Sequence, residues 1–361
     1  MDQALWGIAG LFHREPPTDF TLREIRREES DCRWIVIVRY GRVRRVIKIA
    51  SNGFTDEARV NGWVRIVAAY KRLGCYSPAL CRGLSGEYAY RASFRGRSCV
   101  IWEEEYAPYP LRDELDPQVY QGVDGRFTYH DEIFAFLGKV AQQHFSFFPY
   151  PSGWSRFTPF DPSESCDEVT ECVHAFDRLL RTGAPKHIAH WERILALFQD
   201  NRAKLLPLYG RLPTSVFQGD PFTSNLLLDE QGHWKGLIDY NLAGQDTALN
   251  IFLSTVLFGY AYQAHGEEAP GELPGFGSAA RAEVYRILLD TLKKLRPYYT
   301  FHEEEAEAAP LLYKYITCIE YRQLGALEKY LGDDGRIARL LCHMEEELLA
   351  DYPGFRAAML G

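Results

Sequence analysis

The segment VFQGDPFTSNLLLDEQGHWKGLIDYNLAG, Val216–Gly244, contains two short aliphatic runs on either side of a glycine-containing turn. Such a pattern predicts a β-hairpin. Asn225 starts the first run, Asp220 lies five residues before it, and Asp239 directly follows the second run. A carboxylate beside an aliphatic strand is costly to bury without a partner, and the obvious partner here is a divalent cation. The segment therefore predicts a hairpin that brings oxygen ligands together.

The first hundred residues are rich in strand signals. β-Branched runs on both sides of Gly41 predict one hairpin, and a second hairpin turns at Arg95-Gly96-Arg97. Between the hairpins, apolar residues recur at helical spacing from a predicted N-cap at Thr55 to a stop at Gly74. The predicted order is hairpin, helix, hairpin.

After Glu105 the pattern becomes helical, and only the segment 216–240 interrupts it with short strands. We therefore predict an α+β protein with a β-rich N-terminal lobe, residues 1–105, and a mainly helical C-terminal lobe, residues 106–361. A cleft is expected where the two lobes join. The hairpin described above would belong to the larger lobe.

The composition excludes some classes of function. A formal net charge of −8 and a pI near 5.8 argue against a general nucleic-acid binder, which needs a basic surface. The eight cysteines have no zinc-site or disulfide-framework spacing. The N-terminal apolar stretch is short and follows the acidic Asp2, so we expect neither a signal peptide nor a membrane span. A cytoplasmic protein that does not bind membranes is the expectation, and the sequence does not predict its oligomeric state.

Asp220, Asn225 and Asp239 suit a magnesium-dependent phosphoryl-transfer site. Such a site needs an acidic group that orients the attacking hydroxyl, and oxygen ligands for a magnesium ion that bridges the phosphates. It also needs a cation on the nucleotide phosphates, and Lys48 in the segment RVIKIA is the candidate. Val46, Lys48 and Ala50 share one strand face, where a lysine requires a partner.

Glu57 is the predicted partner of Lys48. It shares a helical face with Val60 and Val64, which should face the sheet. The alternative interpretation is a carboxylate in the first turn, where the helix dipole favours negative charge.

These residues resemble those of the aminoglycoside phosphotransferase/choline kinase-type family, which has a bilobal protein-kinase-like fold. The family typically carries His-Gly-Asp, then an Asn five residues after the Asp, then Ile-Asp-Trp or Ile-Asp-Tyr. This chain has Gln218-Gly219-Asp220, Asn225 and Ile238-Asp239-Tyr240. The resemblance covers most of the chain in order.

The resemblance implies a role for each position. Asp220 would be the catalytic base, and Asn225 and Asp239 the magnesium ligands. Lys48 would bind the phosphates with Glu57 as its helix partner. The segment CVIWEEEYA resembles the hinge of the family, which would read the adenine through backbone groups around Glu103–Glu105.

Three positions depart from the family pattern. Gln218 replaces the usual histidine, and Asn250 replaces a structural aspartate. No glycine-rich loop precedes Lys48. The segment 28–31 occupies that place, so backbone groups and Ser30 would cover the nucleotide phosphates.

We therefore predict an ATP- or GTP-dependent kinase that uses Mg²⁺ to phosphorylate a hydroxyl of a small molecule. Aminoglycosides, amino alcohols and sugars are candidate acceptors, and the sequence does not choose among them. The alternative is a pseudokinase that binds nucleotide or a protein partner with little turnover. A metal-dependent phosphohydrolase would need further clustered His or Asp ligands, which the sequence does not suggest.

Overall fold

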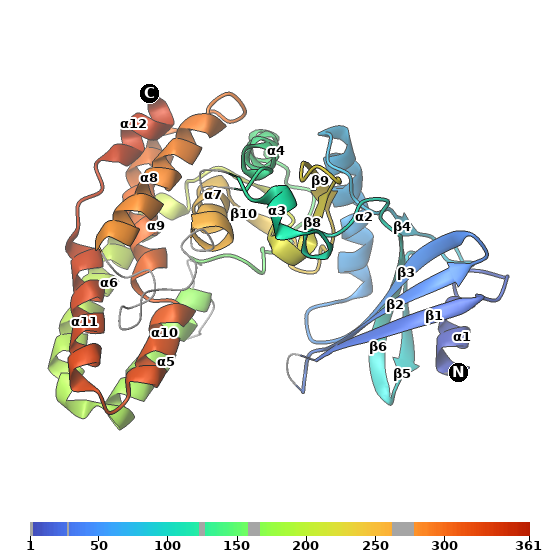
Figure 1. The fold of residues 1–361 in the computed structure, drawn as a ribbon, viewed down its shortest axis with the longest axis horizontal. Coiled ribbons are helices and arrows are strands. Elements are labelled where there is room, and N and C mark those ends of the chain that lie inside the picture. Colours follow the sequence, from blue (N-terminus) through green and yellow to red (C-terminus); the bar gives the residue numbers. More distant parts are fainter. Residues whose placement is uncertain (1–2, 27–28, 123–126, 158–166, 262–277) are drawn as a thin grey trace. The chain divides into compact units, whose positions relative to one another are not determined.

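The computed structural model describes residues 3–26, 29–122, 127–157, 167–261 and 278–361. The chain forms two compact units (Figure 1). The first unit comprises Met1–Asp116 together with Ser224–Ala243, and the second comprises Pro117–Thr223 and Gly244–Gly361. An antiparallel sheet dominates the first unit and helices dominate the second, so the predicted α+β class is confirmed.

The sheet of the first unit has the strand order β1-β2-β3-β6-β4, and β5 pairs with β6. Its strands are β1 (Asp19–Arg26), β2 (Cys32–Tyr40), β3 (Val43–Ser51), β4 (Leu80–Cys81), β5 (Ala89–Phe94) and β6 (Arg97–Glu105). Both predicted hairpins are present, β2–β3 at Gly41 and β5–β6 at Gly96. Each turn glycine has a positive φ angle, which glycine adopts without steric cost.

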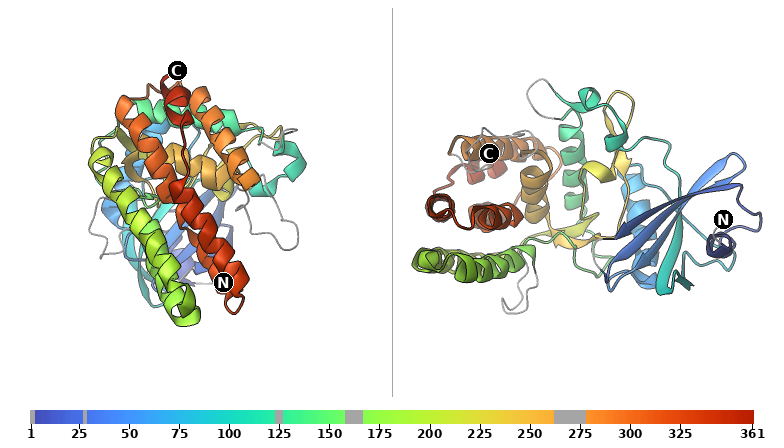
Figure 2. Two further views of the ribbon diagram at one scale, coloured as in Figure 1. Left: turned by 90° about the vertical axis from the view of Figure 1, so that its left-hand side faces the viewer. Right: turned by 60° about the horizontal axis from the view of Figure 1, so that its bottom comes forward.

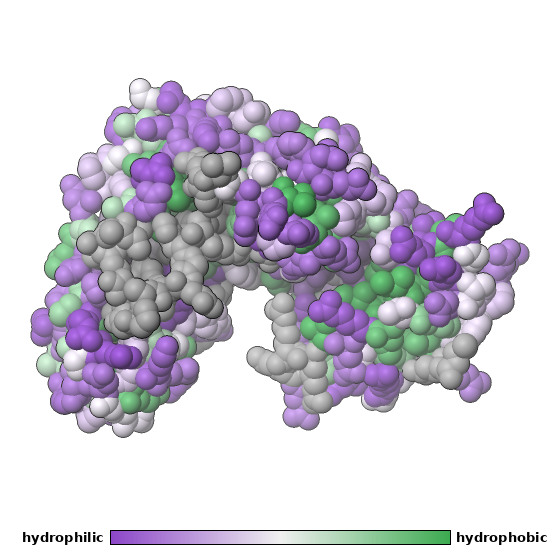
Figure 3. Space-filling model, in the orientation of Figure 1, coloured by the Kyte–Doolittle hydropathy of each residue, from purple (hydrophilic) through white to green (hydrophobic). Residues whose placement is uncertain are grey.

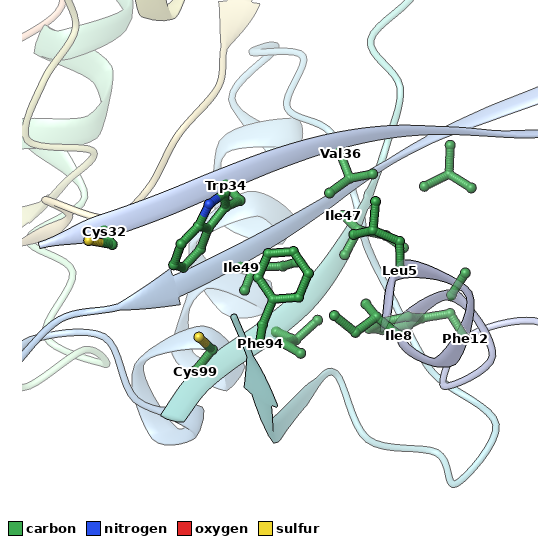
Figure 4. Close-up of a cluster of buried hydrophobic side chains, with 13 residues drawn as sticks. Leu5, Ile8, Phe12, Cys32, Trp34, Val36, Ile47, Ile49, Phe94 and Cys99 are labelled. Atoms are coloured by element: carbon green, nitrogen blue, oxygen red, sulfur yellow. The ribbon is translucent and has the colours of Figure 1, made fainter. Parts of the chain in front are cut away.

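The two faces of this sheet are covered by different helices. Helix α1 (Gln3–Ala9) contributes Leu5 and Ile8 to a hydrophobic cluster with Trp34, Ile47 and other strand residues (Figure 4). Side chains alternate along a strand, so Lys48 lies on the opposite face from Ile47. On that face Trp102 of β6 contacts Trp63 of helix α2 (Glu57–Arg72).

The hairpin β8 (Leu226–Leu228) and β9 (Trp234–Leu237) groups with the first unit. The Tyr76 N–H donates to Lys235 O at 2.9 Å, and the Leu237 N–H donates to Tyr76 O at 3.0 Å. The Leu228 N–H donates to Pro110 O at 3.2 Å. These backbone bonds explain why a segment far along the sequence packs with the N-terminal sheet.

The second unit contains the strand pair β7 (Thr214–Phe217) and β10 (Gly244–Thr247) among helices (Figure 2). Its longer helices are α4 (His130–Gln142), α5 (Glu168–Gly183), α6 (Ile188–Tyr209), α8 (Ser278–Leu295), α9 (Glu303–Cys318), α10 (Tyr321–Tyr330) and α11 (Asp334–Leu349). Shorter elements are α3 (Pro117–Tyr120), η3 (Pro185–His187), α7 (Ala248–Ser254), the π-helical turn η5 (Thr255–Ala261) and α12 (Gly354–Leu360).

Two further turns are short: η1 (Arg112–Glu114), in the first unit, and η4 (Thr223–Asn225), where the chain passes between the units. In the second unit α9 packs against both α6 and α11. In the view of Figure 3, hydrophobic colour gathers over the strands of the first unit, while hydrophilic residues cover much of the rest. None of the described helices combines the length and the apolar character that a membrane span requires.

A buried carboxyl in α9 gives the first testable prediction. Glu305 accepts hydrogen bonds from the Tyr299 hydroxyl at 3.0 Å and the His302 N–H at 2.9 Å, and burial raises its pKa from 4.5 to about 7. The folded state therefore holds a proton that the unfolded state releases. This contribution to the free energy of unfolding is present below pH 4.5 and is lost as the pH rises towards 7.

Glu305→Gln should remove this pH dependence, because the amide does not titrate and can accept from the His302 N–H while it donates to the Tyr299 hydroxyl oxygen. Between pH 5 and 7 its free energy of unfolding should rise relative to wild type by about 1.4 kcal/mol per pH unit. Urea unfolding at several pH values measures the difference, with the exposed Glu303→Gln on the same helix as control. Parallel wild-type and Glu305→Gln stability curves would contradict the prediction.

Candidate functional site

The β8–β9 hairpin brings two predicted magnesium ligands to one end. Asn225 ends η4 directly before β8, and Asp239 follows β9. Leu226 pairs with Leu237, and the Ile238 N–H donates to Asn225 O at 3.0 Å. The antiparallel pairing therefore places Asn225 and Asp239 at the same end of the hairpin. Asp239 has a φ of 60°, in the left-handed region that few non-glycine residues adopt.

Lys48 on β3 lies beside this end of the hairpin. Its Nζ is 3.3 Å from Asp239 Oδ1 and 3.3 Å from Glu104 Oε2. Burial alone would lower the pKa of Lys48. The carboxylates of Asp239 and Glu104 raise this pKa by more than burial lowers it, so the net change is upward. The lysine is therefore a buried, fully charged ammonium at neutral pH.

Glu104 is a partner that the sequence analysis missed. Its carboxylate is nearly buried, and its Oε1 accepts a hydrogen bond from Trp102 Nε1 at 2.8 Å. The register of β3 and β6 pairs Lys48 with Trp102, so residues 102 and 104 share the face of Lys48. The alternation along β6 was visible in the sequence, but the register that aligns it with Lys48 was not.

The predicted pairing of Lys48 with Glu57 is wrong. Glu57 is the first residue of α2, and its carboxylate instead accepts two hydrogen bonds from Arg91 on β5, at 2.9 and 2.6 Å. The hydrogen bonds from Arg91 hold the pKa of Glu57 below its ordinary value. A guanidinium binds both carboxylate oxygens at once, which makes Arg91 a strong competitor for this side chain.

Glu103 and Glu105 lie within and at the end of β6. Glu103 pairs with Ile47 of β3 on one side and Cys81 of β4 on the other, so its backbone lies inside the sheet. Its buried side chain bonds His13 Nε2, on the face opposite Lys48, and burial raises its pKa. The Glu105 N–H donates to Ala79 O at 2.9 Å. The backbone of β6 is therefore engaged in sheet pairing and hydrogen bonds as far as Glu105.

Ser30 lies in the bend between β1 and β2, where its side chain is exposed. Residues 27 and 28 of the same connection lie outside the described part of the chain. Within the segment 28–31, which the sequence predicts to cover the phosphates, Glu29 and Ser30 have exposed side chains.

Asp220 lies in a tight loop of the second unit. Strand β7 leads into Gln218 and Gly219, and the φ of 88° at Gly219 turns the chain. The buried Gln218 side chain accepts a hydrogen bond from the Asp220 N–H at 2.8 Å, and the Phe222 N–H donates to Asp220 O at 2.8 Å. Gln218, which replaces a histidine of the family pattern, therefore supports the loop directly.

Asn250 also has a structural role. Its Nδ2 donates to Asp246 Oδ2 at 2.9 Å, and its Oδ1 accepts from the Arg156 N–H at 3.3 Å. Burial raises the pKa of Asp246 to about 7. An amide at position 250 can donate to this carboxyl, whereas a second carboxylate would repel it. The hydrogen bonds around position 250 thus suit the asparagine that replaces the aspartate of the family pattern.

A buried lysine on an antiparallel sheet, with polar residues at the end of a hairpin and an acidic loop in a helical unit, is the organisation of the protein-kinase-like phosphotransferases. The family model described as "Phosphotransferase enzyme family" matches residues 21–250, more than half of the chain. The chain belongs to this family, and the resemblance drawn from the sequence is confirmed. It is therefore a small-molecule kinase that uses a hydroxyl group as acceptor.

Solved structures with the same fold include a microcompartment-associated aminopropanol kinase. It is 14% identical, with a TM-score of 0.55, and the match covers 99% of this chain and 98% of that one. Choline kinase from Cryptosporidium parvum Iowa II is 12% identical, with a TM-score of 0.49 and 99% coverage of both chains. A spectinomycin phosphotransferase in complex with ADP and spectinomycin is 10% identical, with a TM-score of 0.49, and the match covers 99% and 97%. No curated protein matches the chain significantly.

Proposed function

We propose that this protein transfers the terminal phosphate of ATP or GTP to a hydroxyl of a small molecule in a magnesium-dependent reaction. The buried Lys48 ammonium, held between Glu104 and Asp239, is the observation that carries the proposal. A charged lysine at this depth beside the hairpin end suits a nucleotide phosphate, because it offers a fixed cation in a weakly solvated place.

The residues at the hairpin end fit a magnesium ion. Asp239 offers a carboxylate and Asn225 an amide oxygen, and Mg²⁺ prefers such hard oxygen ligands together with substrate phosphates. A bound magnesium ion would supply positive charge that offsets the charge developing on the phosphates. Asp239 and Asn225 would hold it there.

The sheet face around Lys48 suits a nucleotide base. Ile35 and Ile37 of β2 and Val46 of β3 are on this face and are only partly buried. Partly exposed aliphatic side chains next to a charged group suit a ligand with a flat apolar ring and a charged tail. The pairing of β6 on both sides at Glu103 leaves the segment after this strand to contact the edge of the base.

Asp220 would act on the acceptor. Its carboxylate would accept the hydroxyl proton, or orient the hydroxyl for in-line attack, while the bond from the terminal phosphorus to the bridging oxygen breaks. The hydrogen bond from its backbone N–H to Gln218 holds the loop in place. Positioning and electrostatics, rather than covalent chemistry, would supply most of the rate enhancement.

The acceptor class remains to be selected among amino alcohols, aminoglycosides and sugars. The aminopropanol kinase shares the fold, so amino alcohols are the first acceptors to test. A nucleotide-consumption screen over the three classes, with ATP and with GTP, identifies both substrates. Nucleotide binding without turnover on any acceptor would support the pseudokinase alternative.

The nucleotide site itself can be tested before the acceptor is known. ATP or GTP should raise the melting temperature much more with Mg²⁺ than without it, because Asp239 and Asn225 act through the cation. Asp239→Asn should reduce the magnesium-dependent part of this shift, and exposed Asp113→Asn should not. A wild-type protein that neither nucleotide stabilises, with or without magnesium, would refute the proposal.

A further inference from the structure

Lys48 has two carboxylate partners that differ in how firmly they are held. Its Nζ is 3.3 Å from each, but the Glu104 side chain is 9% exposed and that of Asp239 is 33% exposed. Glu104 lies within strand β6, and Asp239 lies after β9 at a left-handed backbone position. One partner is therefore fixed in the sheet, and the other is more open to solvent.

Glu104 is held on several sides. Trp102 Nε1 donates to its Oε1 at 2.8 Å, and the Trp102 ring packs edge-on against Trp63 of α2, with ring centroids 5.3 Å apart. The backbone of β6 at Glu104 is paired with Val46 on one side and Leu80 on the other. These contacts leave its second oxygen directed at the Lys48 ammonium.

Helix α2 contributes an aromatic ring, not a carboxylate, at this place. In protein kinases the corresponding lysine pairs with a glutamate of a helix. Here Glu57 is engaged with Arg91, and Trp63 is the α2 residue that contacts Trp102. The carboxylate that pairs with Lys48 within this sheet is thus on strand β6 and not on helix α2.

We propose that Glu104 is a positioning residue. It keeps the Lys48 ammonium in place to bind nucleotide phosphates when Asp239 binds magnesium. The proposal rests on the function proposed above. Without metal the cluster has one ammonium and two carboxylates, so it repels phosphate. A divalent cation at Asp239 reverses the sign of the cluster, and Glu104 then remains as the partner that keeps Lys48 in place.

The magnesium concentration needed for ATP binding distinguishes a positioning role of Glu104 from a merely structural one. Without the Glu104 carboxylate, Lys48 should bind Asp239 more firmly and compete with the metal. Glu104→Gln should therefore raise the Mg²⁺ concentration needed for half-maximal ATP binding by about tenfold, the usual scale for a residue that orients a metal ligand. Binding of metal-free ATP should not weaken, since the cluster has lost a negative charge.

The experiment measures ATP affinity by calorimetry across a magnesium titration, together with melting temperatures. Trp102→Phe removes the indole donor to Glu104 and should shift the magnesium requirement in the same direction. This variant therefore tests the proposal even if Glu104→Gln does not fold. Glu57→Gln represents the pairing expected from the sequence, and Glu24→Gln, which loses an exposed pair with Arg95, is the neutral control.

An unchanged magnesium requirement in both Glu104→Gln and Trp102→Phe would overturn the proposal, as would a shift in Glu57→Gln alone. A fall in melting temperature with the wild-type requirement would make Glu104 structural and would also overturn it. Failure of the proposed function has a different signature, because the wild type itself would then not bind magnesium and ATP.

Discussion

Replacing Asp220 with asparagine should lower the rate of phosphate transfer by about 100-fold or more while leaving nucleotide affinity nearly unchanged. The amide keeps the shape of the side chain but can neither accept the hydroxyl proton nor carry the negative charge. The loop itself should persist, because the hydrogen bond to Gln218 comes from the backbone N–H of residue 220. The loss should therefore appear in turnover rather than in folding.

The measurement pairs calorimetry of nucleotide binding with single-turnover phosphate transfer to an acceptor found in the screen. Asp200→Asn, which removes an exposed carboxylate from α6 of the same unit, is the matched control for a lost charge. Equal turnover in wild type and Asp220→Asn would remove Asp220 from the mechanism. A parallel loss of nucleotide affinity would assign Asp220 to the metal instead.

The sequence was a good guide to local structure. Gly41 and Gly96 turn the two predicted hairpins, and Asn225 and Asp239 lie at the same end of a third. Each of these inferences depends on turn chemistry and on alternation over a few residues, which operate within one short segment. The spacing of residues was therefore sufficient to predict that the two proposed magnesium ligands lie at one end of the hairpin.

The partner of Lys48 could not be predicted in the same way. Helical spacing identified the face of α2 that packs on the sheet, but it could not show that Arg91 would capture Glu57. Choosing Glu104 over its neighbours requires the register between β3 and β6, which pairs residues fifty or more positions apart. A shift of one residue would turn the Glu104 side chain to the opposite face.

The position of the hairpin also depended on long-range contacts. Chain order placed residues 216–244 with the later helices, yet 224–243 pack with the N-terminal sheet. Tyr76 and Pro110 supply the backbone bonds that hold them there. These bonds connect segments with no shared sequence pattern, so neither periodicity nor composition could have revealed them.

Gly236→Ala should strongly destabilise the first unit through a single added methyl group. A Cβ at position 236 would lie 1.9 Å from Tyr76 O and 2.7 Å from Tyr76 C, both backbone atoms that cannot rotate away. The hairpin would have to move from Tyr76, which would break the bonds at Lys235 O and the Leu237 N–H. We expect a loss of about 3 kcal/mol in the free energy of unfolding, the upper end of the usual range for overpacking.

The same displacement should weaken nucleotide binding with magnesium, because Asp239 lies three residues beyond the glycine and its contact with Lys48 depends on where β9 ends. Denaturant unfolding and calorimetry measure the two effects. Gly53→Ala is the control, since a Cβ there meets no atom within 4 Å and should change neither quantity. Wild-type stability and affinity in Gly236→Ala would show that the close approach of β9 to Tyr76 is not what positions Asp239. If nucleotide affinity falls by more than the unfolded fraction of the variant accounts for, the close approach of β9 to Tyr76 does position Asp239.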